Sequence, residues 1–183
     1  MGKKALIVLA EGFEETEAVI PIDILRRVGV EVTVAGLGDE TIKGSHGLSI
    51  KTDVVFENYL GDPDVIILPG GMPGAENLVN SVDLKSLIIK LFAAGKIVAA
   101  ICASPALVLV PLGVLEGKSA TCFPGLEKNF PASVKRSKEK IIQDGNLITA
   151  CGAGIAFDFG LKIAENLVGR SRSDMIAEQM CYS

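Results

Sequence analysis

Short apolar runs alternate with amphipathic segments along the whole chain. The apolar runs have the length of buried strands, and they are Ala5–Ala10, Val30–Ala35, Asp64–Leu68, Lys96–Ile101, Ser119–Phe123 and Gly145–Ala150. Other segments repeat apolar residues at helical spacing, and we expect helices at Glu14–Val28, Asp83–Ala94, Ala103–Leu112 and Gly154–Leu167. Continuous apolar strands that alternate with helices are typical of a parallel sheet covered on both faces. We therefore predict one α/β domain over residues 1–183, a flavodoxin-like three-layer sandwich with a mostly parallel sheet.

Two local patterns add detail to this prediction. Pro21 lies inside the first helical pattern and should either kink the helix or mark a restart in it. The segment Thr41–Asp53 alternates polar and apolar residues around two glycines, which suggests a hairpin at the edge of the sheet.

Charge and cysteine content narrow the class of protein. The chain is 49% hydrophobic and 22% charged, with a formal net charge of −4, so nothing favours nucleic acid or a membrane as a partner. No apolar run approaches the ~20 residues that span a bilayer, and acidic residues rather than a cleavage site follow Ala5–Ala10. The four cysteines show no CxxC spacing and the chain has one histidine, which argues against a zinc site. We expect a cytoplasmic protein with reduced thiols.

Three segments of unusual composition follow predicted strands: Glu11–Glu17, Pro69–Gly74 and Ile101–Pro105. Ligands of open parallel sheets bind beyond the carboxyl ends of the strands, so we expect these segments to meet in one crevice. The glycines that follow Pro69, Gly70 among them, would let backbone N–H groups approach a ligand, although a tight turn needs the same residues. Neither a Walker A ending nor a GxGxxG pattern is present, which disfavours nucleotide binding.

Cys102 is the candidate nucleophile. It has small neighbours and lies between a predicted strand and a predicted helix, as in a nucleophile elbow, although the G-x-S-x-G motif is absent. A helix N-terminus after Cys102 would place partial positive charge near the sulfur and lower the pKa of the thiol. A buried structural cysteine fits the same residues, because cysteine also behaves as a small hydrophobe.

Acidic residues and the single histidine are the other candidates. Glu14, Glu15 and Glu17 begin the first helix, where carboxylates suit the helix macrodipole. One of them, if it points into the crevice, could become protonated and hydrogen-bond the thiolate. His46 lies on the expected hairpin, where we expect it at the surface; if it reaches the crevice, it would contact substrate.

Taken together, these segments resemble the ThiJ/PfpI superfamily, in particular the branch of the parkinsonism-associated protein deglycase and its bacterial relatives. The matching stretches are spread over nearly the whole chain, and they are Ala5–Glu17, Asp23–Gly36, Asp64–Gly71, Val98–Pro105 and Gly145–Thr149 with Gly152 and Gly154. The resemblance implies that Cys102 is the nucleophile and that Glu17 is the acid that hydrogen-bonds it. It also implies that the backbone N–H groups of Gly71 and Ala103 form an oxyanion pocket, and that the protein is a homodimer.

The activity implied by the resemblance is a cofactor-free glyoxalase or deglycase that acts on methylglyoxal, glyoxal or their protein adducts. Redox sensing through oxidation of Cys102, chaperone action, and hydrolysis of other small molecules are the alternatives within the superfamily. A Cys-His protease loses its support, because Ala103 replaces the histidine that directly follows the nucleophile in those relatives. Phe123 likewise replaces a histidine that precedes a proline in the deglycase branch, which predicts weak turnover rather than none. His46 and Cys151 stand where relatives carry arginine.

Overall fold

A seven-stranded sheet is the centre of the structure, a computed structural model that describes residues 2–182. In chain order its strands are β1 (Lys4–Leu9), β2 (Glu31–Gly36), β5 (Val54–Val55), β6 (Val65–Leu68), β7 (Ile97–Ile101), β10 (Ile141–Asp144) and β11 (Leu147–Ala150). The spatial order is β10-β11-β7-β6-β1-β2-β5, and every pair is parallel except β10 with β11. Strands β2, β1, β6, β7 and β11 thus follow the 2-1-3-4-5 order of flavodoxin-like folds, which confirms the predicted fold class.

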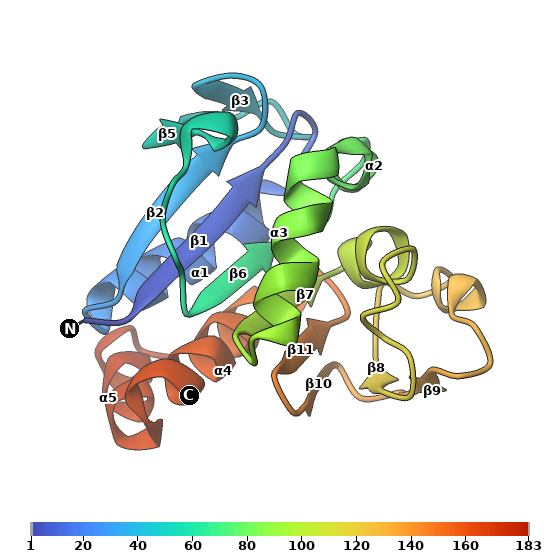
Figure 1. Ribbon diagram of the computed structural model, residues 1–183. Helices are drawn as coiled ribbons and strands as arrows, with labels where there is room; N and C mark the ends of the chain where they lie inside the picture. Colours follow the sequence, from blue (N-terminus) through green and yellow to red (C-terminus); the bar gives the residue numbers. More distant parts are fainter. Residues whose placement is uncertain (1, 183) are drawn as a thin grey trace.

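Helices cover both faces of this sheet (Figure 1). Helices α1 (Glu15–Arg27), α4 (Ala156–Val168) and α5 (Arg170–Gln179) share one face, and α2 (Gly74–Asn80) and α3 (Val82–Ala93) lie on the other. Alternate side chains of the central strands point into the two resulting apolar cores: Leu6 and Val8 belong to the core beneath α3, and Ile7 and Leu9 belong to the core beneath α1. The continuous apolar strands of the sequence are therefore explained by burial on both faces.

Two small sheets lie outside the main one. Strands β3 (Thr41–Lys43) and β4 (Ser49–Lys51) form an antiparallel hairpin, and β8 (Ser119–Ala120) pairs in parallel with β9 (Lys135–Arg136). The prediction of a hairpin is confirmed, but its place at the sheet edge is wrong, since β5 occupies that edge. The hairpin instead bonds to the loop after β1, where the N–H of Gly12 donates to the carbonyl of Lys43 at 2.8 Å.

The predicted helices are found with two differences. Pro21 lies within α1, which continues through it as one helix rather than restarting. The expected helix after Cys102 is a π-helix, η2 (Pro105–Leu109), followed by turns. Single turns of 3₁₀ helix occur at η1 (Phe56–Asn58), η3 (Glu127–Asn129) and η4 (Ala153–Ile155). Within residues 2–182, no helix is both long enough and apolar enough to cross a membrane.

Candidate active site

Cys102 occupies a strained turn at the carboxyl end of β7. Its φ of 64° lies in the left-handed region, which costs a residue with a side chain about 1–2 kcal/mol. Hydrogen bonds on both sides hold this conformation: the N–H of Cys102 donates to the carbonyl of Ala150 at 2.9 Å, and the N–H of Phe123 donates to the carbonyl of Cys102 at 2.7 Å. Strain of this kind is retained where the surrounding structure enforces it, often at functional sites. The sequence comparison with a nucleophile elbow therefore describes the observed backbone well.

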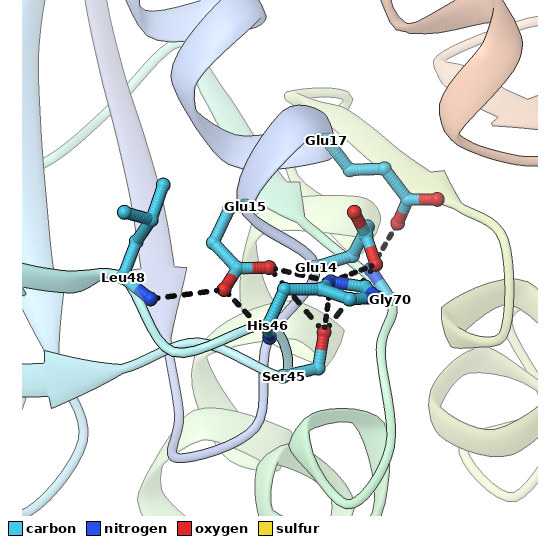
Figure 2. A network of polar contacts seen from close by, with 7 residues as sticks. All are labelled: Glu14, Glu15, Glu17, Ser45, His46, Leu48 and Gly70. Atoms are coloured by element: carbon cyan, nitrogen blue, oxygen red, sulfur yellow. Dashed lines mark hydrogen bonds and ion pairs between the residues drawn. The ribbon is translucent and has the colours of Figure 1, made fainter.

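Glu17 is the acidic partner that the fold brings to this turn. Its side chain is completely buried near the start of α1, and its Oε2 accepts a hydrogen bond from the N–H of Gly70 at 2.8 Å (Figure 2). Its other oxygen, Oε1, has no hydrogen-bond partner among the described residues. Burial raises the pKa of Glu17 to about 7, against the opposing effects of the Gly70 N–H and the Cys102 thiol. A carboxyl group with this pKa exchanges a proton readily at neutral pH.

The thiol of Cys102 does not have the lowered pKa that the sequence suggested. Burial, followed by the charge and hydrogen bonding of Glu17, raises the pKa of Cys102 to about 12, while the backbone N–H groups of Gly71 and Ala103 lower it. The helix that should have supplied positive charge is here a short π-helix that begins at Pro105. At pH 7 these values leave Cys102 protonated and Glu17 about half protonated. A thiolate therefore forms only when the thiol gives up its proton, and an ionised Glu17 is the buried group beside it that can accept one.

Close backbone approach explains the glycines after β6. A Cβ on Gly70 would lie 2.7 Å from the Cβ of Cys102 and 2.9 Å from the Oε2 of Glu17. Gly71 has a φ of 87° and packs as closely on the loop after β1, near Gly12. The three segments predicted to form one crevice, Glu11–Glu17, Pro69–Gly74 and Ile101–Pro105, do meet at this point.

A buried serine that the sequence analysis overlooked joins two of these segments. The hydroxyl of Ser104, whose side chain is fully buried, donates to the carbonyl of Pro69 at 2.5 Å. The hydrogen bond ties the turn that carries Cys102 to the glycine-rich loop. A small polar residue two positions after the nucleophile was the only sequence feature that could have indicated it.

A cavity of about 600 Å³ opens over the sulfur. Its lining includes Cys102, both proposed oxyanion donors and a ring of apolar side chains, and these residues are Gly71, Met72, Glu76, Cys102, Ala103, Leu107, Phe123, Pro124, Gly125 and Leu126. Phe123, identified from the sequence as the replacement for a histidine, is thus a wall of the candidate site. Glu76, Leu107 and Leu126 were not identified from the sequence, because their patterns are those of ordinary helix and loop residues.

His46 does not line this cavity. Its side chain is 72% exposed, and its Nδ1 lies 2.9 Å from the Oε2 of Glu15 and 3.3 Å from the Oε2 of Glu14 (Figure 2). Burial acts to raise the pKa of Glu15, but hydrogen bonds from the side chain and N–H of His46 and from the N–H of Leu48 lower it to about 2. The pKa of His46 is raised in turn, chiefly by its hydrogen bond to Glu15. The structure gives His46 the role of holding the hairpin to α1.

Glu14, Glu15 and His46 are also the candidate metal ligands within residues 2–182. One ligand atom from each of Glu14, Glu15 and His46 lies within 4.8 Å of the others. Their atoms already bond to one another and to the N–H groups of the hairpin, so the cluster is explained as a structural network.

The fold and the candidate site define a class: flavodoxin-like α/β sandwiches that carry a cysteine on a strained turn after a central strand, next to a buried carboxyl group. Comparison with known proteins places the chain within that class. The chain belongs to the DJ-1/PfpI family, whose model matches residues 3–166.

Relatives match it over almost their whole length. The chain is 40% identical over 181 residues to Protein dj-1beta of Drosophila melanogaster, covering 97% of this chain and 96% of the relative. It is 32% identical over 183 residues to the glutathione-independent glyoxalase DJR-1.2 of Caenorhabditis elegans, and the match covers 99% of this chain and 97% of the relative. The oxidized Toxoplasma gondii DJ-1 structure superposes with a TM-score of 0.96 at 38% identity, covering 100% of both chains. The family resemblance found in the sequence is confirmed.

Proposed function

We propose that the protein is a cofactor-free glyoxalase or deglycase that acts on small α-oxoaldehydes or their adducts through Cys102. The observation that carries the proposal is the pairing of a strained, cavity-facing thiol with a completely buried carboxyl group whose pKa is about 7. The relative from Caenorhabditis elegans that is described as a glutathione-independent glyoxalase supports the same reaction class.

The proposed reaction begins with transfer of a proton from Cys102 to Glu17. Glu17 takes the proton of the Cys102 thiol, and the thiolate attacks the aldehyde carbon, forming a C–S bond. The N–H groups of Gly71 and Ala103, which lower the pKa of the Cys102 thiol, bind the developing oxyanion in this proposal, and Glu17 then protonates it to give a hemithioacetal. The next steps isomerise the substrate without any external oxidant or reductant.

In those steps Glu17 moves a proton between two neighbouring carbons. Its carboxylate removes the proton on the thiolated carbon and returns a proton to the adjacent carbonyl carbon. The hydroxyl proton of the hemithioacetal moves to the second oxygen, so the first oxygen becomes the thioester carbonyl and the second becomes a hydroxyl group. The product is a 2-hydroxyacyl thioester of Cys102, which water cleaves to the free hydroxy acid and the thiol. A base with a pKa near the working pH is the most effective for such transfers.

The test is the formation of lactate from methylglyoxal by the wild type, Cys102→Ser and Glu17→Gln. We expect no turnover in Cys102→Ser and a loss of about 10²–10⁴-fold in Glu17→Gln, the usual contribution of a general acid–base group. Cys181→Ser is the matched control, because Cys181 is an exposed free thiol outside the cavity and its removal should change nothing. Full activity in Cys102→Ser would refute the proposal.

A second candidate function is a redox response of Cys102. The relative from Toxoplasma gondii was solved in an oxidized form, and here Oε1 of Glu17 is an unpaired buried oxygen beside the thiol. Two equivalents of peroxide would convert the thiol to a sulfinic acid, and a protonated Glu17 could donate to it. Limited peroxide followed by peptide mass analysis tests this; oxidation of another cysteine before Cys102 would refute it.

The homodimer implied by the resemblance stays a prediction. Sedimentation equilibrium of the purified protein measures it directly, and a monomer at micromolar concentration would contradict it.

A further inference from the structure

The cavity over Cys102 is much larger than methylglyoxal requires. Its volume of about 600 Å³ lies in the range of sites that enclose drug-sized ligands, roughly 300–1,000 Å³. Beyond its two carbonyl groups, methylglyoxal carries only a methyl group. Most of the cavity is therefore left for a larger substituent on the carbon chain that reacts at Cys102.

The chemical character of the walls limits what that substituent can be. Met72, Leu107, Phe123, Pro124 and Leu126 supply apolar surface around the sulfur. Besides the nucleophile itself, Glu76 is the one lining residue with an ionisable side chain, and it is acidic. The cavity offers no cation to balance a phosphate or carboxylate, so it disfavours anionic substituents and suits uncharged, apolar ones.

Phe123 is the aromatic side chain of this wall. It is 48% exposed, as is Met72 at 49%, although side chains of this size are usually buried. The backbone of Phe123 is fixed to the nucleophile, because its N–H donates to the carbonyl of Cys102 at 2.7 Å. The ring also lies against Gly152, where an added Cβ would be 3.6 Å from its Cδ2. The backbone of Phe123 is therefore fixed next to the nucleophile, and its ring lies near Gly152 and lines the cavity.

We propose that the preferred substrates are α-oxoaldehydes with a bulky, uncharged substituent, aromatic for preference, and that Phe123 selects them. The inference rests on the proposed function and adds its substrate class. The chemistry at Cys102 is unchanged: an aryl α-oxoaldehyde plus water gives the aryl hydroxy acid, with phenylglyoxal giving mandelate. The aryl group covers Phe123 and its apolar neighbours, which removes their surface from water and allows an offset-stacked or edge-to-face contact between rings.

The direct test compares kcat/KM for phenylglyoxal and methylglyoxal. A single added methylene in an apolar pocket gives about 10–200-fold discrimination, so we expect phenylglyoxal to be favoured at least about tenfold by the wild type. In Phe123→Ala the preference should fall about tenfold, with the loss in phenylglyoxal rather than methylglyoxal turnover. Phe123→Tyr keeps the ring and should keep the preference, and Leu60→Ala, at an exposed residue outside the cavity, is the control. A preference for methylglyoxal, or one unchanged in Phe123→Ala, would overturn the inference.

Alkylation of Cys102 separates the failure of this inference from failure of the proposed function. Phenacyl chloride and chloroacetone carry the same two substituents, and each forms a C–S bond at its CH₂ group with loss of chloride. Their rates at Cys102, measured by peptide mass analysis, are divided by their rates with N-acetylcysteine.

The normalised ratio requires no turnover. If neither α-oxoaldehyde is converted, the proposed glyoxalase function is refuted. Faster normalised alkylation by phenacyl chloride than by chloroacetone, with the difference reduced in Phe123→Ala, would still support the preference of the cavity for a bulky apolar substituent. Equal normalised rates for the two reagents in the wild type would overturn it whatever the enzyme assay shows.

Discussion

Replacing Gly70 by alanine places a methyl group in the centre of the candidate site. The new Cβ would lie 2.7 Å from the Cβ of Cys102, which is about 0.7 Å closer than the 3.4 Å at which ordinary contact begins. It would also lie 2.9 Å from the Oε2 of Glu17 and 3.0 Å from the N of Ala103. None of these atoms is the end of a flexible, exposed side chain. The turn that carries Cys102 and the carboxyl group of Glu17 must therefore shift relative to residue 70.

The magnitudes follow from the size of that shift. Overpacking of a filled site usually costs about 1–3 kcal/mol of unfolding free energy. Displacement of catalytic groups by about 1 Å can lower turnover about 10²-fold, and we expect a loss of about 10–100-fold in kcat for Gly70→Ala. Urea unfolding measures the first effect and hydroxy acid formation the second. The rate of Cys102 alkylation by iodoacetamide gives a third readout that needs no turnover.

Gly154 provides the matched control. An added Cβ there meets no atom within 4 Å, and its φ lies outside the left-handed region. Gly154→Ala should therefore leave activity unchanged and stabilise the protein by up to about 1 kcal/mol, through the lower entropy of the unfolded chain. The reasoning would be refuted if Gly70→Ala were as stable, as active and as readily alkylated as Gly154→Ala.

Three further substitutions test the polar contacts around the site. The pKa of Glu17 is raised from 4.5 to about 7 in the folded protein, so the wild type should lose up to about 3 kcal/mol of stability as the pH rises from 4.5 to 7. In Glu17→Gln this loss should disappear, and urea unfolding at several pH values measures it; an unchanged pH dependence would contradict the raised pKa. Ser104→Ala removes the hydrogen bond to the carbonyl of Pro69 and should lower the free energy of unfolding by about 1–3 kcal/mol, whereas Ser86→Ala, at an exposed serine, should lower it little. Equal urea midpoints for the two variants would contradict this role of Ser104. The pKa of Glu15 is lowered to about 2, so its stabilising effect is present above pH 4.5 and lost as the pH falls towards 2; Glu15→Gln should therefore be destabilised most at neutral pH, and a variant equally stable at pH 7 would refute the network.

The apolar runs of the sequence predicted five of the seven strands of the main sheet, which are β1, β2, β6, β7 and β11. Strands β1, β2, β6 and β7 begin and end within one or two residues of the predictions, because burial on both faces leaves mostly apolar residues in them. Strand β10 was missed, since its four partly buried or exposed residues, Ile141–Asp144, are too few to form a clear apolar pattern, and its position depends on pairing with β11. Helix α5 was missed for a similar reason: it is mostly polar and is held by a few contacts such as the hydroxyl of Ser173 on the carbonyl of Leu161.

Features of the candidate site that depend on neighbouring residues could be predicted from the sequence, and features that depend on packing between distant segments could not. Small residues around Cys102 are a local feature, and they indicated the turn correctly. The glycines after β6 are also a local feature, but the close approach that the structure shows is to Cys102 and Glu17, and approach to a ligand stays a prediction. The pKa of Cys102 was predicted in the wrong direction, because burial and the charge of Glu17 arise from packing between segments far apart in the chain. The position of His46 also depends on packing, since the hairpin folds onto α1 rather than onto the sheet edge.

The two shifted pKa values are best understood as one property of the site. Glu17 lies near the N-terminus of α1, where the helix dipole and the N–H of Gly70 favour the carboxylate, yet complete burial favours the acid more strongly. The Cys102 thiol is held as an acid by burial and by an ionised Glu17, whereas the hydrogen bond of the thiol lowers the pKa of Glu17. Moving the proton from sulfur to oxygen removes the buried charge on Glu17 and places a charge on Cys102, which the N–H groups of Gly71 and Ala103 favour. In the proposed reaction the thiolate of Cys102 attacks an electrophilic carbon while Glu17 is the carboxylic acid, so the buried Glu17 is the group that has to accept the proton of the thiol.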